Sequence, residues 1–194
     1  MKIAICELES ISPYSQSRKH NEPKLDGGKE SNADFESRTW QEKAHYNAAG
    51  HVFITPMAFK WSLEKAAAFL SEPIPGKGKS KYTKHFKSGI LVIEGLVIPP
   101  GITRDEVRRD FGWWGHMNAD GRRGSGTRVM RCFPDFPTWS GVVSYHVLDA
   151  TITEDVFERY LKEAGNFIGI GRFRPENGGY YGRYKVNSIH WENA

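Results

Sequence analysis

A strand, a capped helix and a second strand follow one another in the first half of the chain, and this order limits the possible folds more than any other feature. Residues 2–8, KIAICEL, have the apolar run of a core strand. A helix is expected to begin with Thr55 as its N-cap and Pro56 in its first turn, and to reach about Leu70. Residues 89–98, GILVIEGLVI, form the strongest strand pattern of the chain.

The same order returns near the end of the chain. Residues 139–149 read as a strand, and Thr153 caps a second main helix that has Gly165 as its C-cap. A closing strand is expected near 179–191. Two strand–helix–strand units predict an α+β fold of the ferredoxin-like, or RRM-like, kind.

Two long insertions interrupt this expected core, one after the first strand and one between the two halves. Residues 10–35 are polar with turn residues throughout, and an ordered domain rarely carries so long a loop without a use for it. Between the halves, Thr103 begins a short helix that runs to about Phe111. Residues 112–137, rich in glycine and arginine, are expected to be irregular.

The composition is that of one globular domain. The chain has 194 residues, of which 39% are hydrophobic and 26% charged, and both fractions are ordinary. It contains no run of about 18 apolar residues, and its first residues read as a strand rather than as a signal peptide. Cys6 and Cys132 lie far apart in the sequence without a CxxC motif, so we expect buried, reduced thiols in a cytoplasmic protein.

Residues 165–185 form the segment most suggestive of a function. They combine six glycines, four basic residues and five aromatic residues. Glycine allows close backbone approach, arginine and lysine neutralise phosphates, and aromatic rings stack on bases. The segment is therefore expected to cradle a nucleic-acid backbone, with its arginines outside the core. The alternative is a glycine-eased hairpin with surface arginines.

Three other segments offer basic or aromatic side chains, each with a solvated loop or a small core satellite as the alternative interpretation. In residues 12–20, hydroxyl groups and basic residues suit contacts to an RNA backbone and its 2′-hydroxyls. The lysines of residues 77–87 could form a mobile basic lid. In residues 111–127, paired tryptophans beside two arginines could stack on bases and bind phosphates.

Catalysis finds little support in the sequence. It contains no GxSxG, HExxH or CxxC motif. Arg174 replaces the third glycine of a dinucleotide-binding motif, and Pro73 replaces the first glycine of a P-loop. His20 and His116 are weak candidates for a general base in RNA cleavage. We therefore expect no enzymatic activity, no cofactor and no metal site.

A glycine-rich loop between the second helix and the last strand of a ferredoxin-like fold resembles the signature of the RAMP superfamily, the repeat-associated RNA-binding proteins of CRISPR systems. The matching residues are 168–186, IGIGRFRPENGGYYGRYKV. Ser12 and Pro13 resemble the polar turn that these proteins carry after the first strand. The insertion at about 99–137 resembles the thumb of their guide-RNA-binding backbone subunits. The resemblance implies one RAMP-like domain over residues 1–194.

The resemblance implies a non-enzymatic, sequence-tolerant RNA-binding protein of antiviral defense, either a CRISPR backbone subunit or a viral relative of one. Its partners would be single-stranded guide RNA, target nucleic acid, and further copies or other subunits of a ribonucleoprotein complex, with no membrane. One alternative is a RAMP-like, metal-independent endoribonuclease that processes repeat RNA with His20 or His116. Another is a phage protein that inhibits a CRISPR complex by protein–protein binding. The expected RNA contacts are Arg18, Lys19, Lys77, Lys79, Lys81, Lys84, Trp113, Trp114, Arg122, Arg123, Arg172, Arg174, Gly178, Gly179, Tyr180, Tyr181, Gly182, Arg183 and Lys185.

Overall fold

The computed structural model describes residues 1–119, 121, 124 and 126–193, and it confirms a mixed α+β fold with antiparallel sheets. Its main sheet has four strands, β1 (Lys2–Ser10), β4 (Ile90–Val92), β8 (Ser140–Val147) and β9 (Tyr184–Asn193). Their order across the sheet is β4-β8-β1-β9, and every neighbouring pair is antiparallel. The first strand of the chain therefore lies inside the sheet, beside the last.

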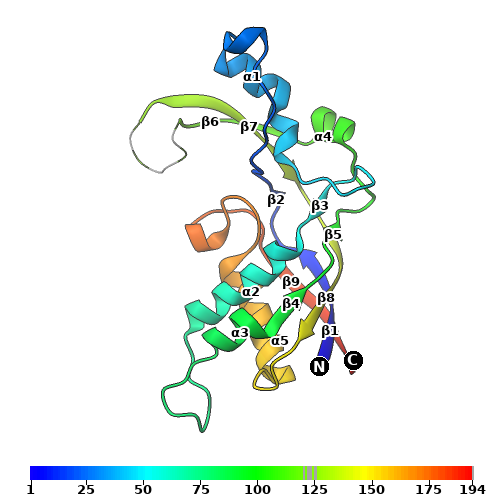
Figure 1. The fold of residues 1–194 in the computed structure, drawn as a ribbon, viewed down its shortest axis with the longest axis vertical. Coiled ribbons are helices and arrows are strands. Elements are labelled where there is room, and N and C mark those ends of the chain that lie inside the picture. Colours follow the sequence, from blue (N-terminus) through cyan, green and yellow to red (C-terminus); the bar gives the residue numbers. More distant parts are fainter. Residues whose placement is uncertain (120, 122–123, 125, 194) are drawn as a thin grey trace.

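Three helices cover one face of this sheet, namely α2 (Pro56–Leu70), α3 (Thr83–Gly89) and α5 (Glu154–Glu163) (Figure 1). Aromatic side chains fill the space between the layers. Phe86 of α3 stacks on Tyr160 of α5, with ring centroids 4.5 Å apart. Both side chains are fully buried, as are the inward residues of β1, so the core of this layer is continuous.

The predicted helix starts are confirmed. The Thr153 hydroxyl accepts a hydrogen bond from the backbone N–H of Val156 at the start of α5. Thr103 and Glu106 form a reciprocal capping box at the start of α4 (Arg104–Asp110). The predicted end of α5 is wrong, because Gly165 lies inside a π-helical turn, Ala164–Ile168, that follows the helix.

The predicted strand at 89–98 is in fact two strands in different sheets. β4 belongs to the main sheet, whereas β5 (Leu96–Val97) pairs with β3 (Phe53–Ile54). The chain crosses from one sheet to the other at Gly95, where a Cβ would lie 2.5 Å from the carbonyl oxygen of Ile54. A side chain at residue 95 would therefore block the β3–β5 pairing.

The two insertions pack together into a second lobe above the main sheet (Figure 1). The expectation that residues 112–137 are irregular is wrong, since β6 (Gly112–Asn118) and β7 (Arg128–Phe136) form a projecting hairpin. β2 (Tyr14–Ser15), from the first insertion, pairs with the other edge of β7. The alternation of buried residues along the second half of β7 explains why it is a strand, because every second side chain faces the lobe interior.

Helices also occur where the sequence analysis expected loops. The first insertion contains α1 (Asn32–Thr39), which Ser31 caps by accepting a hydrogen bond from the Asp34 N–H, and the 3₁₀ turns Asp26–Gly28 and Trp40–Lys43. α3 was likewise expected as part of a basic loop.

Three remaining expectations concern the last strand, the cysteines and membrane insertion. β9 begins at Tyr184 rather than near residue 179, because the preceding residues belong to the glycine-rich loop. Cys6 and Cys132 are buried free thiols, as predicted. Within the described ranges, no helix has both the length and the apolar character needed to cross a membrane.

Candidate nucleic-acid interface

The glycine-rich loop, which we define as residues 169–183, is bound along its length to the segment after β1. Its backbone donates hydrogen bonds from Arg172 N–H to Ser15 O at 2.8 Å and from Gly182 N–H to Pro13 O at 2.7 Å. In the opposite direction, Ile11 N–H donates to Arg183 O at 2.8 Å. These backbone hydrogen bonds hold the loop in place between the two lobes.

The glycines of this loop, which were expected to let an RNA backbone approach, allow close contacts within the protein. Gly182 has a φ of 77°, and a Cβ there would overlap the carbonyl oxygen of Ile170. A Cβ on Gly179 would overlap the carbonyl oxygen of Phe173. Gly178 ends a short 3₁₀ turn in the left-handed conformation. These three glycines allow the loop to fold tightly on itself.

Arg172 joins the loop to the hairpin. Its guanidinium lies 3.6 Å from the ring centroid of Phe133 on β7 and 5.8 Å from that of Trp113 on β6. The ring of Tyr181 is 6.0 Å away, and Nη2 is 3.0 Å from the sulfur of Met117. We call these five residues the hairpin–loop junction. The partial burial of Arg172 lowers its pKa, against the favourable charge of Tyr181 and Asp135.

Two further charged groups lie at the junction. The Lys43 ammonium is 4.2 Å from the Phe133 ring centroid, so two cations share one aromatic ring. Burial raises the pKa of Asp135, while the charge of Arg172 acts in the opposite direction. Oδ1 of Asp135 is buried and has no hydrogen-bond partner among the described residues. The junction thus holds its charges in a largely apolar setting.

Exposed aromatic rings surround the junction. Trp113 is 39% exposed and Tyr180 is 60% exposed, and the rings of Tyr180 and Tyr181 meet edge to face at 5.8 Å. Phe173 is also exposed. Trp114 points away from its neighbour Trp113, as alternate residues of a strand do, and its ring meets that of Trp40 at 6.4 Å. Of the two paired tryptophans, only Trp113 faces the loop.

Arg174 is not a surface residue, so the expectation that the loop arginines lie outside the core is wrong. Its guanidinium lies 3.8 Å from the ring centroid of Trp61 on α2 and donates to Glu176 and to the carbonyl oxygen of Gly171. Burial lowers its pKa, and the charge of Glu176 opposes this shift. Arg174 therefore holds the loop against α2 and has little capacity left for a phosphate.

The other expected contacts of the glycine-rich segment are also engaged within the protein. Arg183 donates from Nε to the carbonyl oxygen of Asn166 at 3.1 Å. Lys185 lies on β9, where it forms an exposed ion pair with Glu9 at 3.0 Å. Neither side chain belongs to the junction.

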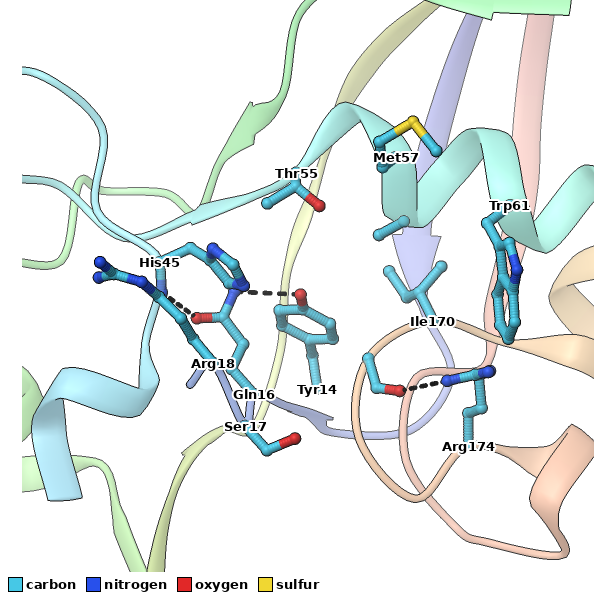
Figure 2. A pocket seen from close by; sticks show the side chains of 12 residues that line it. Tyr14, Gln16, Ser17, Arg18, His45, Thr55, Met57, Trp61, Ile170 and Arg174 are labelled. Carbon is cyan, nitrogen blue, oxygen red and sulfur yellow. Dashed lines mark hydrogen bonds between the residues drawn. The ribbon is translucent and has the colours of Figure 1, made fainter. Parts of the chain in front are cut away.

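The polar segment after β1 is only partly available for RNA. Ser12, Tyr14, Ser15 and Gln16 are buried, and the Gln16 amide donates to the Tyr14 hydroxyl and to the carbonyl oxygen of Phe53. Ser17, Arg18 and Lys19 follow on the surface. Arg18 lies at the mouth of a pocket, shown in Figure 2, that opens beside the loop.

The expected basic lid lies far from the junction. Lys77, Lys79, Lys81 and Lys84 belong to the turn between α2 and α3 and to the start of α3, at the end of the molecule opposite the hairpin (Figure 1). Lys77 donates to the Thr151 hydroxyl and Lys81 to the Ser71 hydroxyl. The structure does not bring these lysines together with the other predicted contacts.

Two histidine candidates lie outside the junction, and two arginine candidates fall on residues that the structure does not describe. Arg122 and Arg123 lie outside the described residues. His116 is exposed on β6, and His20 stacks on Phe35 with its Nδ1 buried. Neither imidazole is paired with a carboxylate in the part of the chain that the structure describes. The residues that the structure describes contain no group of three or more His, Cys, Asp or Glu that could hold a metal ion.

Sequence reasoning missed Phe133, Met117 and Lys43 as members or neighbours of the site. Apolar and polar residues do not alternate in the sequence 128–136, so the pairing of Phe133 with Trp113 across the hairpin has no clear sequence signal. The contact of this pair with Arg172 spans two distant parts of the chain and has no sequence signal.

The chain matches none of the models of known protein families, and a search of the curated proteins finds no match either.

Proposed function

We propose that this chain binds single-stranded RNA at the hairpin–loop junction, with little preference for base sequence. The observation that supports this most is the contact of Arg172 with Trp113 and Tyr181, which joins two segments that each carry their own sequence signal for RNA binding. Exposed aromatic faces lie around one arginine there, in the combination that non-specific single-strand binding uses.

The role proposed for each side chain follows from its exposure and from the segment that it faces. Bases would stack on Trp113, the tryptophan of the hairpin that faces the loop, and on Tyr180, which is 60% exposed. Arg172 would fix the junction and present the exposed part of its guanidinium to the RNA. Arg18, which lines the pocket beside the loop, and its exposed neighbour Lys19 would neutralise phosphates. Stacking and phosphate contacts carry little base identity, so the binding would be sequence-tolerant.

We further propose that the core is a ferredoxin-like fold of the RAMP kind, and that the RNA is a CRISPR guide RNA bound by a backbone subunit or a viral relative. The strand order β4-β8-β1-β9 supports the fold, since it is the order that two interlocked strand–helix–strand units produce. The glycine-rich loop precedes β9, and in this proposal the β6–β7 hairpin would be the thumb. Self-association along RNA, cytoplasmic location and the absence of catalysis belong to the same proposal.

Removing the two exposed rings tests the proposed site. Trp113→Ala and Tyr180→Ala should each weaken binding of a fluorescently labelled single-stranded RNA about tenfold, because one base–aromatic stack contributes about 1–3 kcal/mol. Fluorescence anisotropy at fixed salt measures the change. Phe69→Ala is the control, since Phe69 is an aromatic residue as exposed as Tyr180 but lies on α2 outside the junction. Equal affinities for wild type and both junction variants would contradict the proposal.

A further inference from the structure

A pocket of about 410 Å³ lies on the side of the glycine-rich loop where Arg174 packs on Trp61 (Figure 2). Four parts of the chain line it: residues 14–18 in and after β2, His45, the residues from Thr55 through the first turns of α2, and the loop. We call it the α2 pocket. Its lining residues are Tyr14, Gln16, Ser17, Arg18, His45, Thr55, Met57, Ala58, Trp61, Ile170, Gly171 and Arg174.

The charge of the lining is one-sided. It contains two arginines and a histidine but no carboxylate. Glu176 offsets the charge of Arg174, whereas Arg18 forms no ion pair with any described residue. The Thr55 side chain makes no capping hydrogen bond, and the first turn of α2 holds no acidic residue, so the positive end of the helix dipole adds to the field of Arg18. This lining favours an anionic ligand.

His45 lies at the same end of the pocket as Arg18 (Figure 2). Its backbone N–H donates to the Gln16 side chain at 2.7 Å, but no described residue hydrogen-bonds to its ring nitrogens. Burial, and then the charge of Arg18, lower the pKa of His45, so the imidazole is neutral at neutral pH. The negative charge of a bound anion would raise the pKa of His45 again and favour the imidazolium.

The other end of the pocket is lined by Met57 and by Trp61, on whose ring the Arg174 guanidinium packs at 3.8 Å. Met57 is 59% exposed and Trp61 lies beyond it on the same face of α2, as Figure 2 shows. The hydroxyls of Ser17 and Thr55 lie between the two ends. A ligand that fits this distribution carries a phosphate at one end and a flat or apolar group at the other, and the volume suits one nucleotide.

We infer that the α2 pocket holds one nucleotide of the bound RNA, with its phosphate at Arg18 and His45 and its base against Met57 and Trp61. This inference rests on the proposed RNA-binding function, which it extends by a second contact point. The junction and the pocket lie on opposite sides of the loop, because Arg172 points to the hairpin and Arg174 to α2. A strand that crosses the loop would contact both.

The test uses AMP and adenosine as probes of the full chain, with NMR signals of the His45 ring as the readout. AMP should shift these signals and adenosine should bind at least tenfold more weakly, because it lacks the phosphate. Arg18→Ala should weaken AMP binding about tenfold. Arg108→Ala is the matched control, since Arg108 is an exposed arginine on α4 without an ion-pair partner among the described residues.

The pH dependence adds a signature that a purely structural role of His45 would not give. Because a phosphate favours the imidazolium, the affinity of the wild type for AMP should rise as pH falls through the titration range of His45. The variant His45→Gln should lack that part of the rise. The titration of AMP itself is common to both proteins and cancels in their difference.

The outcomes separate this inference from the proposed function. If AMP binds no better than adenosine, or if Arg18→Ala leaves AMP binding unchanged, the inference is wrong even where RNA binding depends on Trp113 and Tyr180. If AMP binds as expected but single-stranded RNA does not bind the wild type, the proposed function fails, and with it the assignment of the nucleotide to RNA. Both the inference and the proposed function are supported if Arg18→Ala weakens AMP binding and Arg108→Ala does not, and if RNA binding depends on Trp113 and Tyr180.

Discussion

Gly182→Ala should lower the free energy of unfolding by about 3 kcal/mol. Residue 182 has a φ of 77°, and holding a non-glycine residue there costs about 1–3 kcal/mol. The added Cβ would also overlap the carbonyl oxygen of Ile170, and relieving such an overlap costs about another 1–3 kcal/mol. The Gly182 N–H donates to Pro13 O, so a shift of this residue would loosen the loop from the segment after β1.

Urea unfolding of Gly182→Ala beside Gly76→Ala checks this prediction. Gly76 has a φ of 74°, but a Cβ there would meet no atom within 4 Å. The variant Gly76→Ala therefore has the backbone strain without the overlap, and its free energy of unfolding should fall by only about 1 kcal/mol. Equal losses in the two variants would show that the packing of Gly182 against Ile170 contributes nothing.

Glu36→Gln should also destabilise the fold by about 3 kcal/mol. The Glu36 carboxylate, 4% exposed in the second lobe, accepts hydrogen bonds from Lys43, from the Arg131 guanidinium at 3.0 Å and from the Cys132 N–H at 2.8 Å. The amide cannot balance the charge of the poorly exposed Lys43, and breaking a buried pair typically costs about 3–5 kcal/mol. Lys43 also lies over Phe133, so the junction would be disturbed.

Glu158→Gln is the control, because Glu158 pairs with Lys162 on the exposed face of α5. This variant should lower the free energy of unfolding by about 0.5 kcal/mol or less.

Burial alone would raise the pKa of Glu36, but the hydrogen bonds from Lys43 and Cys132 outweigh it, and the pKa is lowered. Its stabilising effect is therefore complete above about pH 4.3 and is lost as pH falls below that value. The acid-induced loss of stability should be smaller in Glu36→Gln, and identical pH profiles would contradict the assignment.

The elements that the sequence predicts correctly are those with strong local signals. Thr55, Thr103 and Thr153 stand at helix starts, and the short apolar segments of β1 and β8 bury every second residue, as strands do. The order of these elements also predicts the α+β class. In each case the decisive interactions lie within a few residues of one another in the chain.

The errors lie where contacts between distant segments decide the structure. Glycines and prolines conceal the β6–β7 hairpin, and its pairing with β2 depends on a partner about 120 residues away. Arg172 and Arg174 look like surface residues in the sequence, yet Phe133 and Trp61, from other elements, cover them. Of the site, the sequence therefore predicts the chemistry of the loop and Trp113 but not which side chains meet.

Photo-crosslinking of a 4-thiouridine-labelled single-stranded RNA, followed by mass spectrometry of the crosslinked peptides, tests the central claim most directly. The account predicts crosslinks to the peptides that contain Trp113 and Tyr180, on either side of the hairpin–loop junction. Trp113→Ala should remove the crosslink to its own peptide and reduce the other. Crosslinks confined to the lysines of the α2–α3 turn, or the absence of any crosslink above that of an unlabelled RNA, would contradict it.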